Sequence, residues 1–188
     1  MLIGTGTTGR IYKTTDYGLT WNSLGVALAG EADIDFLTYL RNNVVIGSTY
    51  PNSKVIRSTN GGTSWSDLGQ FGTGTFMSNC ATSGAGVAII CESNIGHCWQ
   101  TVDYGANWLD LGRMGGQNII RIAYLENGIY VGGTSPNGKV VRSTEYGLGD
   151  ETSYTFTNVQ DDHALTATYA SVSETDSGSS FGGSGNFR

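Results

Sequence analysis

Carboxylate and amide side chains recur at a regular spacing along this chain, at Asp16, Asn60, Asp103 and Glu145. Successive members of this set are 44, 43 and 42 residues apart. Such a side chain could act as a catalytic acid or base, or it could accept backbone N–H groups and close a tight turn. The regular spacing favours the second role, because each unit of a repeating fold places the same turn once.

Each of these residues lies in a short repeated segment, and we call the four segments boxes 1 to 4. A Ser or Thr stands two positions before the acid or amide, a Gly two positions after it and, in boxes 1 to 3, a Trp five positions after it. The Gly permits the positive φ that a tight turn needs. The Trp is expected to begin the next strand and to fill the seam between two repeats. The Gly and Trp positions are Gly18 and Trp21, Gly62 and Trp65, Gly105 and Trp108, and Gly147 in box 4, which has no Trp.

The boxes need strands on both sides to position them, and the sequence between the boxes has strand patterns. These patterns stand at 34–40, 75–80 and 119–124 and, after a short turn, at 44–48, 87–91 and 129–133. A further strand then leads into each box, and another begins at its Trp. Four strands in each repeat predict an all-β fold, a small β-propeller of about four blades with four-stranded antiparallel sheets.

The predicted propeller domain covers 1–172, and its first blade is split between the two ends of the chain. A C-terminal strand is expected to supply the missing inner strand of blade 1 and to close the ring. Residues 173–188 are rich in Gly and Ser and are expected to form an arm. A fragment of a larger propeller is the alternative. The blades are expected at about 1–30 plus 163–172, 31–72, 73–115 and 116–162.

The pattern Ser/Thr-x-Asp-x-Gly-x-Thr-Trp resembles the Asp box, or bacterial neuraminidase repeat. Box 1 matches it in full, box 3 matches it closely, and box 2 carries Asn60 in place of the acid. Asp boxes occur in sialidases, sortilin-type receptors, photosystem assembly factors and many phage and bacterial surface proteins. The resemblance covers about residues 1–158. It implies a propeller whose boxes lie on the outer rim, away from any active site.

A basic or titratable residue follows the turn between the second and third strands of every repeat. Because these turns would share one face of a propeller, the four side chains could surround an anionic or hydroxyl-rich ligand such as a glycan. The alternative, which we favour, is that they are solvated charges that discourage edge-to-edge strand pairing. The four residues are Arg10, Lys54, His97 and Lys139.

Catalytic groups outside the boxes are sparse. The chain has seven arginines, and these do not assemble into the arginine cluster that sialidases use to hold a substrate carboxylate. No phosphate-binding loop or nucleophile motif is present. A glycosidase acid pair remains open among four residues, Asp33, Asp35, Asp67 and Asp110.

The three cysteines, Cys80, Cys91 and Cys98, argue against a disulfide framework because their number is odd. Cys91 and Cys98 flank a predicted hairpin turn and would stand opposite each other if it centres on residues 94–95, so a cross-strand disulfide is one alternative. The favoured alternative is three small buried side chains in one blade. A metal site that uses His97 as well is disfavoured, because no second ligand pair appears. No cofactor is expected.

The net charge of −6 does not suit a nucleic-acid partner, and no apolar run reaches the length of a membrane span. The first residues lack a signal-peptide pattern. We therefore expect a non-enzymatic propeller module for attachment or assembly on a phage virion or microbial surface. Its partners would be other protein subunits of that assembly, with a glycan as a candidate ligand, and its location extracellular or on the virion surface. A fragment of a sialidase-like glycoside hydrolase is the alternative.

Overall fold

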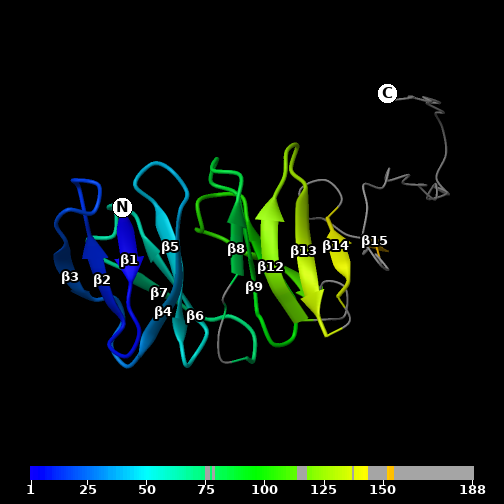
Figure 1. Cartoon of the computed structure of the whole chain (residues 1–188), viewed down its shortest axis with the longest axis horizontal. Helices are drawn as coiled ribbons and strands as arrows, with labels where there is room; N and C mark the ends of the chain where they lie inside the picture. The colour runs from blue at the N-terminus through cyan, green and yellow to red at the C-terminus, as the bar shows by residue number, and fades with distance from the viewer. Residues whose placement is uncertain (75–76, 78, 114–117, 137, 144–151, 155–188) are drawn as a thin grey trace. The chain divides into compact units, whose positions relative to one another are not determined.

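The computed structural model describes residues 1–74, 77, 79–113, 118–136, 138–143 and 152–154, which form strands and turns (Figure 1). Residues Met1–Thr157 make one unit, and a second unit, Asn158–Arg188, lies outside the described residues. The predicted closing strand at 163–172 and the arm at 173–188 fall in that second unit. Within the described ranges, no helix is long and apolar enough to cross a membrane.

The described strands form four antiparallel sheets, each built from strands that are consecutive in the sequence. Sheet 1 contains β1 (Leu2–Gly4), β2 (Arg10–Lys13) and β3 (Asn22–Val26). Sheet 2 contains β4 (Asp33–Tyr39), β5 (Val45–Tyr50), β6 (Lys54–Ser58) and β7 (Ser66–Gln70). Sheet 3 contains β8 (Asn79–Thr82), β9 (Ala88–Cys91), β10 (His97–Thr101) and β11 (Leu109–Arg113). Sheet 4 contains β12 (Asn118–Tyr124), β13 (Tyr130–Ser135), β14 (Val140–Arg142) and β15 (Thr152–Tyr154).

These sheets confirm the predicted all-β propeller fold with four-stranded antiparallel blades. Sheet 1 has three strands among the described residues, and β1 pairs with β2 as β5 pairs with β6 in sheet 2. The sheets pack on one another in sequence order: β4 lies against β1 and β8, and β8 lies against β12. Figure 1 shows the same succession from blue to yellow.

Strand β9 of sheet 3 is buried on both of its faces. The four residues of β9 are all 0% exposed, and they alternate between two core clusters. Ala88 and Ile90 join a cluster shared with sheet 2, whereas Ile89 and Cys91 join a cluster shared with sheet 4. A strand that is covered on both faces needs apolar side chains at successive positions. This burial explains why polar and apolar residues do not alternate along β9.

Cys91 of β9 and Cys98 of β10 stand directly opposite each other and form a disulfide, with their Cα atoms 4.1 Å apart. The favoured prediction of three unpaired cysteines is therefore wrong for two of them. An odd count misled it, because the pair closes within a single hairpin and leaves Cys80 as the free thiol. Burial raises the pKa of the Cys80 thiol to about 12, so this group is protonated at neutral pH.

Box 1 closes the turn between β2 and β3 through its acid and its first hydroxyl. The Asp16 carboxylate accepts the N–H of Thr20 at 2.9 Å and the hydroxyl of Thr14 at 2.7 Å. The Thr14 oxygen in turn accepts the N–H of Gly18 at 2.9 Å. Gly18 has a φ of 92°, a conformation in which L side chains are strained.

Boxes 2 and 3 repeat this arrangement in sheets 2 and 3. Asn60 Oδ1 and Asp103 Oδ1 each accept the N–H group four residues later at 2.9 Å. An amide therefore closes the turn as a carboxylate does, and Asn60 in box 2 leaves the fold of the turn unchanged. Glu145 and Gly147 of box 4 lie outside the described residues. The glycines two positions after Asn60 and Asp103 also have positive φ, 87° at Gly62 and 75° at Gly105.

The box tryptophans differ in what they contact. Trp65 Nε1 donates to the carbonyl of Gly62 in its own box at 3.1 Å. Trp108 packs edge-on against Phe71, which precedes sheet 3, with ring centroids 5.5 Å apart. Trp21 is half-buried. The seam-filling role expected of these residues is therefore clearest at Trp108, where a ring of sheet 3 meets the end of sheet 2.

Asp16 offers a test of the box turn. Hydrogen bonds from the hydroxyl and N–H of Thr20, and then from Thr14, lower the pKa of Asp16 from 3.8 to about 2. A carboxyl whose pKa is lower in the folded protein stabilises it above the unfolded pKa, and this contribution is lost as the pH falls through the folded pKa. Asp16→Asn, which copies Asn60, should stay folded at neutral pH and lose less stability between about pH 4 and pH 2. Urea midpoints at several pH values measure this, and equal acid dependence in both proteins would contradict the role of Asp16.

Candidate functional site

The four residues predicted to share a loop face occupy one equivalent position in the four sheets. Arg10, Lys54 and His97 are the first residues of β2, β6 and β10, and Lys139 immediately precedes β14. Arg10 is exposed and Lys139 is half-buried. Because each residue belongs to a different sheet, what each can bind depends on its own neighbours.

Lys54 and His97 are each held by an aspartate on the adjacent strand. Lys54 Nζ lies 2.8 Å from Asp67 Oδ2, and His97 Nε2 lies 2.5 Å from Asp110 Oδ1. The hydrogen bond from His97 lowers the pKa of the Asp110 carboxyl. Ser23 occupies the place of these aspartates in sheet 1. Lys54 is therefore a cross-strand partner and not an unpaired cation facing a ligand.

A pocket of about 410 Å³ opens beside His97, and we call it the aromatic pocket. Its wall joins the connection after β7 to side chains of β10 and β11. The Phe71 ring centroid lies 5.7 Å from that of Trp99 and 5.5 Å from that of Trp108. The lining residues are Gln70, Phe71, Gly72, Thr73, His97, Trp99, Trp108 and Asp110.

His97 is fixed on two sides within this pocket. Its imidazole is stacked on the Trp99 indole, with the centroids 4.3 Å apart and the planes only 7° from parallel. Its Nε2 faces the Asp110 carboxylate. Trp99 itself is only 7% exposed, so the imidazole covers the indole and presents a polar edge to the pocket. The pocket therefore combines aromatic surface with an oriented histidine–carboxylate pair.

Glu92 lies behind the connection that forms one wall of the pocket. Its side chain is fully buried, and Oε1 accepts the N–H of Gly74. Oε2 has no hydrogen-bond partner among the described residues. A Cβ at position 72 would stand 2.5 Å from Oε2 and 2.8 Å from the Trp99 ring, so only Gly72 lets the backbone approach both groups. Burial raises the pKa of Glu92.

Asp33 and Asp35, members of the predicted acid pair, both lie on β4 in sheet 2. Burial raises the pKa of Asp35 to about 6, the N–H of Met77 opposes this shift, and the charges of Asp33 and Glu31 add to it. Asp33 Oδ1 accepts the N–H of Thr7. A carboxyl that keeps its proton near neutral pH, within electrostatic range of another acid, is the combination that glycosidases use.

Sequence reasoning identified His97 as a candidate site residue and Trp108 as a box residue, but it missed their neighbours in the aromatic pocket. Phe71 lies in a connection outside the repeated pattern, so no periodic signal marks it. Trp99 stands in a strand pattern, where an aromatic residue usually belongs to the core. Glu92 directly follows the apolar run at 87–91, and a carboxylate beside a fully buried strand is a signal that could have marked it.

Comparison with protein-family models and with curated proteins finds no match for this chain. Solved β-propeller structures do resemble it. One is a structure of YCF48 bound to D1 peptide, with a TM-score of 0.61 and 22% sequence identity, over 82% of this chain and 49% of that one. The Asp-box resemblance therefore stays a prediction from the motif, while the propeller fold is supported by structure.

Two further neighbours are enzymes by name. Virginiamycin B lyase from Staphylococcus aureus matches with a TM-score of 0.66 and 12% identity, over 81% of this chain and 50% of that one. The GH74 xyloglucanase from Xanthomonas campestris matches with a TM-score of 0.62 and 16% identity, over 78% and 27%. The chain thus spans half or less of the length of these neighbours, and likeness at such identities shows the fold alone.

Removal of the Glu92 charge should change the free energy of unfolding in a defined direction. A carboxyl whose pKa is raised by folding carries no penalty below its unfolded pKa of 4.5 and costs stability as the pH rises above that value. Glu92→Gln should therefore raise the unfolding free energy at pH 7, because the neutral amide carries no charge for burial to penalise. Its stability should also depend less on pH above 4.5.

Glu31→Gln is the matched control, with the opposite expected sign. Glu31 is buried too, but its two oxygens accept the Thr49 hydroxyl at 2.9 Å and the Asn52 amide at 2.8 Å. A glutamine would turn an N–H donor toward one of these donors and should cost about 1–3 kcal/mol. Chemical denaturation at pH 5 and pH 7 measures both variants. Destabilisation by Glu92→Gln at pH 7 would contradict the assignment.

Proposed function

We propose that this chain is a non-enzymatic β-propeller module for attachment or assembly on a phage virion or microbial surface, and that it binds a glycan in the aromatic pocket. The arrangement of this pocket carries the proposal: the rings of Phe71 and Trp108 stand beside the His97–Asp110 pair. A sugar has an apolar C–H face and a rim of hydroxyl groups. It therefore suits a wall that joins aromatic surface to hydrogen-bonding side chains.

The side chains of the aromatic pocket are also preorganised for binding. His97 is held by the Trp99 ring and by Asp110, so little side-chain freedom is left to lose on binding. Gln70 and Thr73 add an amide and a hydroxyl, groups that can both donate to and accept from a sugar. The volume of about 410 Å³ falls in the usual range of roughly 300–1,000 Å³ for small-ligand sites.

The non-enzymatic part of the proposal is supported by what four of the carboxylates already contact. Asp16 and Asp103 accept backbone N–H groups within their boxes. Asp67 and Asp110 are paired across strands with Lys54 and His97. These acids hold turns and strand pairs together, and a carboxylate engaged in this way is poorly placed to exchange protons with a substrate.

The setting of the module is proposed from the resemblance of boxes 1 to 3 to Asp boxes, which occur in phage and bacterial surface proteins. We propose other protein subunits of such an assembly as its partners and the virion surface or the extracellular space as its location. The YCF48 structure with bound peptide is an example of a propeller of similar fold that holds a polypeptide.

Glycan-array screening followed by calorimetry tests the aromatic pocket. His97→Ala and Asp110→Asn should each weaken binding of any array hit by about tenfold, the cost of one hydrogen bond to a polar or charged group. The matched controls are Lys54→Ala and Asp67→Asn, which break the equivalent pair one sheet away. Equal loss in both sets, or no loss at His97, would contradict binding at this pocket.

A glycoside hydrolase is the second candidate function, and Asp35 is the observation that favours it. With its pKa raised to about 6, Asp35 could donate a proton while Asp33 stays available as the second carboxylate. The chain would then be part of a longer sialidase-like enzyme. A catalytic acid of this kind is lost when the pH rises above its pKa.

A panel of fluorogenic glycosides separates the two functions. The module proposal expects no turnover by the full chain at any pH between 4 and 8. Hydrolysis that declines above about pH 6 and is lost in Asp35→Asn would support the hydrolase instead. Asp16→Asn, which leaves β4 and the four predicted acids untouched, should not change such an activity and serves as the control.

A further inference from the structure

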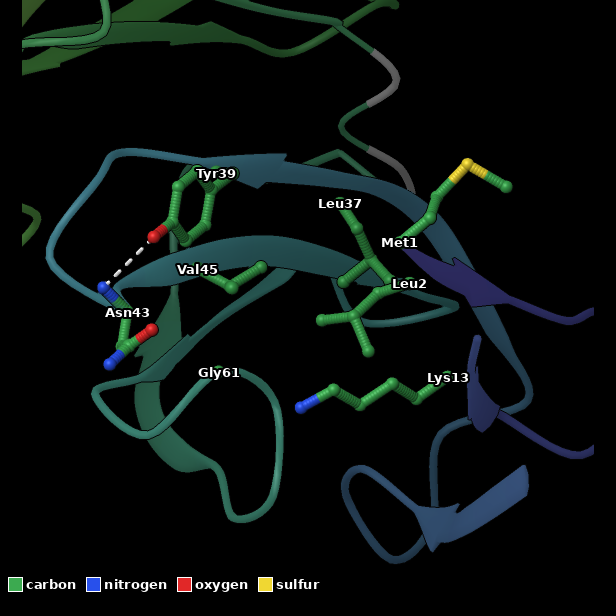
Figure 2. A pocket seen from close by; sticks show the side chains of 8 residues that line it. All are labelled: Met1, Leu2, Lys13, Leu37, Tyr39, Asn43, Val45 and Gly61. Carbon is green, nitrogen blue, oxygen red and sulfur yellow. Dashed lines mark hydrogen bonds between the residues drawn. The ribbon is translucent and has the colours of Figure 1, made fainter. Parts of the chain in front are cut away.

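A second pocket, of about 490 Å³, lies at the seam between sheets 1 and 2, and we call it the seam pocket (Figure 2). It is formed by β1 and β2 on one side and by β4, β5 and box 2 on the other. It shares no residue with the aromatic pocket, whose lining comes from sheet 3, the connection before it and Gln70 at the end of β7. Its lining residues are Met1, Leu2, Lys13, Leu37, Tyr39, Asn43, Val45 and Gly61.

The next seam along the chain, between sheets 2 and 3, explains why this space is open. Gly61 and Tyr104 occupy the same position in boxes 2 and 3, and their N–H groups make the same bond across the seam, to Asn43 at 2.8 Å and to Gly86 at 2.9 Å. The Tyr104 ring lies directly over Gly86, within 2.7 Å of where a Cβ would stand. Gly61 has no side chain to place there, so the seam pocket is the volume that a tyrosine fills in the next seam.

The cation at each seam also differs in its partner. Arg57 of β6 donates from Nε to the carbonyl of Tyr104 at 2.7 Å and so ties sheet 2 to box 3. Lys13 occupies the equivalent position in β2. Among the described residues its ammonium makes no ion pair or hydrogen bond, and it lies 3.7 Å from where a Cβ on Gly61 would stand. Asn43 Oδ1 lies 4.0 Å from the same point.

Apolar side chains form the rest of the seam pocket. Figure 2 shows the Lys13 side chain extending below Leu2 toward the Gly61 turn, with Leu37 and Val45 above it. Tyr39 stands at the rim, and its hydroxyl accepts the N–H of Asn43 at 3.2 Å. The half-buried Lys13 side chain therefore faces an apolar wall, and no carboxylate stands among the described residues that line the pocket.

We propose that the seam pocket binds a monocarboxylate that carries a short apolar tail. The carboxylate pairs with Lys13 Nζ, because a charge-assisted hydrogen bond to a half-buried ammonium is stronger than the bond to water that it replaces. The tail covers Leu2, Leu37 and Val45 and removes apolar surface from water. Both parts are required, since Lys13 supplies one charged contact and the second ammonium of the wall, that of Met1, already donates to the Thr14 carbonyl at 2.9 Å.

Binding of hexanoate, measured by calorimetry and by amide NMR shifts, tests this assignment. Hexanoate should bind at least about tenfold more tightly than either 1-hexanol, which lacks the charge, or acetate, which lacks the tail. Shifts should concentrate on β1, β2 and box 2. Equal affinity for hexanoate and 1-hexanol, or shifts elsewhere on the protein, would overturn the proposal.

Two variants and one control locate the site. Lys13→Gln should weaken hexanoate binding by about tenfold or more, whereas Lys54→Gln removes the same charge outside the pocket and should leave it unchanged. Gly61→Tyr should block binding by filling the volume. The substitution is compatible with the backbone, because Tyr17 and Tyr104 adopt φ of 58° and 60° at this box position and Gly61 has 68°. Full binding by Lys13→Gln overturns the proposal whether or not Gly61→Tyr folds.

The source of the carboxylate is a separate question that the same assay answers. Acetyl-Gly-Leu with a free C-terminus and its C-terminal amide are compared with hexanoate. Tight binding of the free peptide acid and not of its amide supports the terminus of a polypeptide as the source, and preference for hexanoate supports a free organic acid. Binding of the amide as tight as that of the acid would contradict a carboxylate site.

Discussion

Each sheet of this chain can bury its apolar strands only against a neighbouring sheet, and most of the structure depends on that requirement. A single four-stranded sheet has two faces and too little thickness to form a core by itself. Sheet 3 shows the result, since successive residues of β9 enter two different clusters. Boxes 1 to 3 contribute to this packing, because each of them closes the turn that leads into the fourth strand of its sheet.

The two candidate sites are consequences of how the seams are filled. Where sheet 3 meets the end of sheet 2, three aromatic rings pack together and leave a pocket beside His97. Where sheet 2 meets sheet 1, glycine replaces the tyrosine of the equivalent box and leaves a pocket beside Lys13. Tyr17, at the same box position in sheet 1, is fully exposed, whereas Tyr104 packs over Gly86.

Much of the fold could be predicted because its signals are local and repeated. The box spacing indicated the number of sheets, and the runs before each box indicated which segments pair. The cysteine prediction failed because a count over the whole chain cannot detect a bond within one hairpin. The partners of Lys54 and His97 could not be predicted, because Asp67 and Asp110 stand 13 residues later and meet them only through strand register.

Strand order and turn closure by Asp16, Asn60 and Asp103 follow from residue types and short spacings. The stacking of His97 on Trp99, the buried carboxylate of Glu92 and the open seam at Gly61 do not. Each of these depends on side chains from different sheets or connections meeting across a seam. The spacing of residues along the chain cannot predict such contacts, because these contacts are determined by how whole sheets pack on one another.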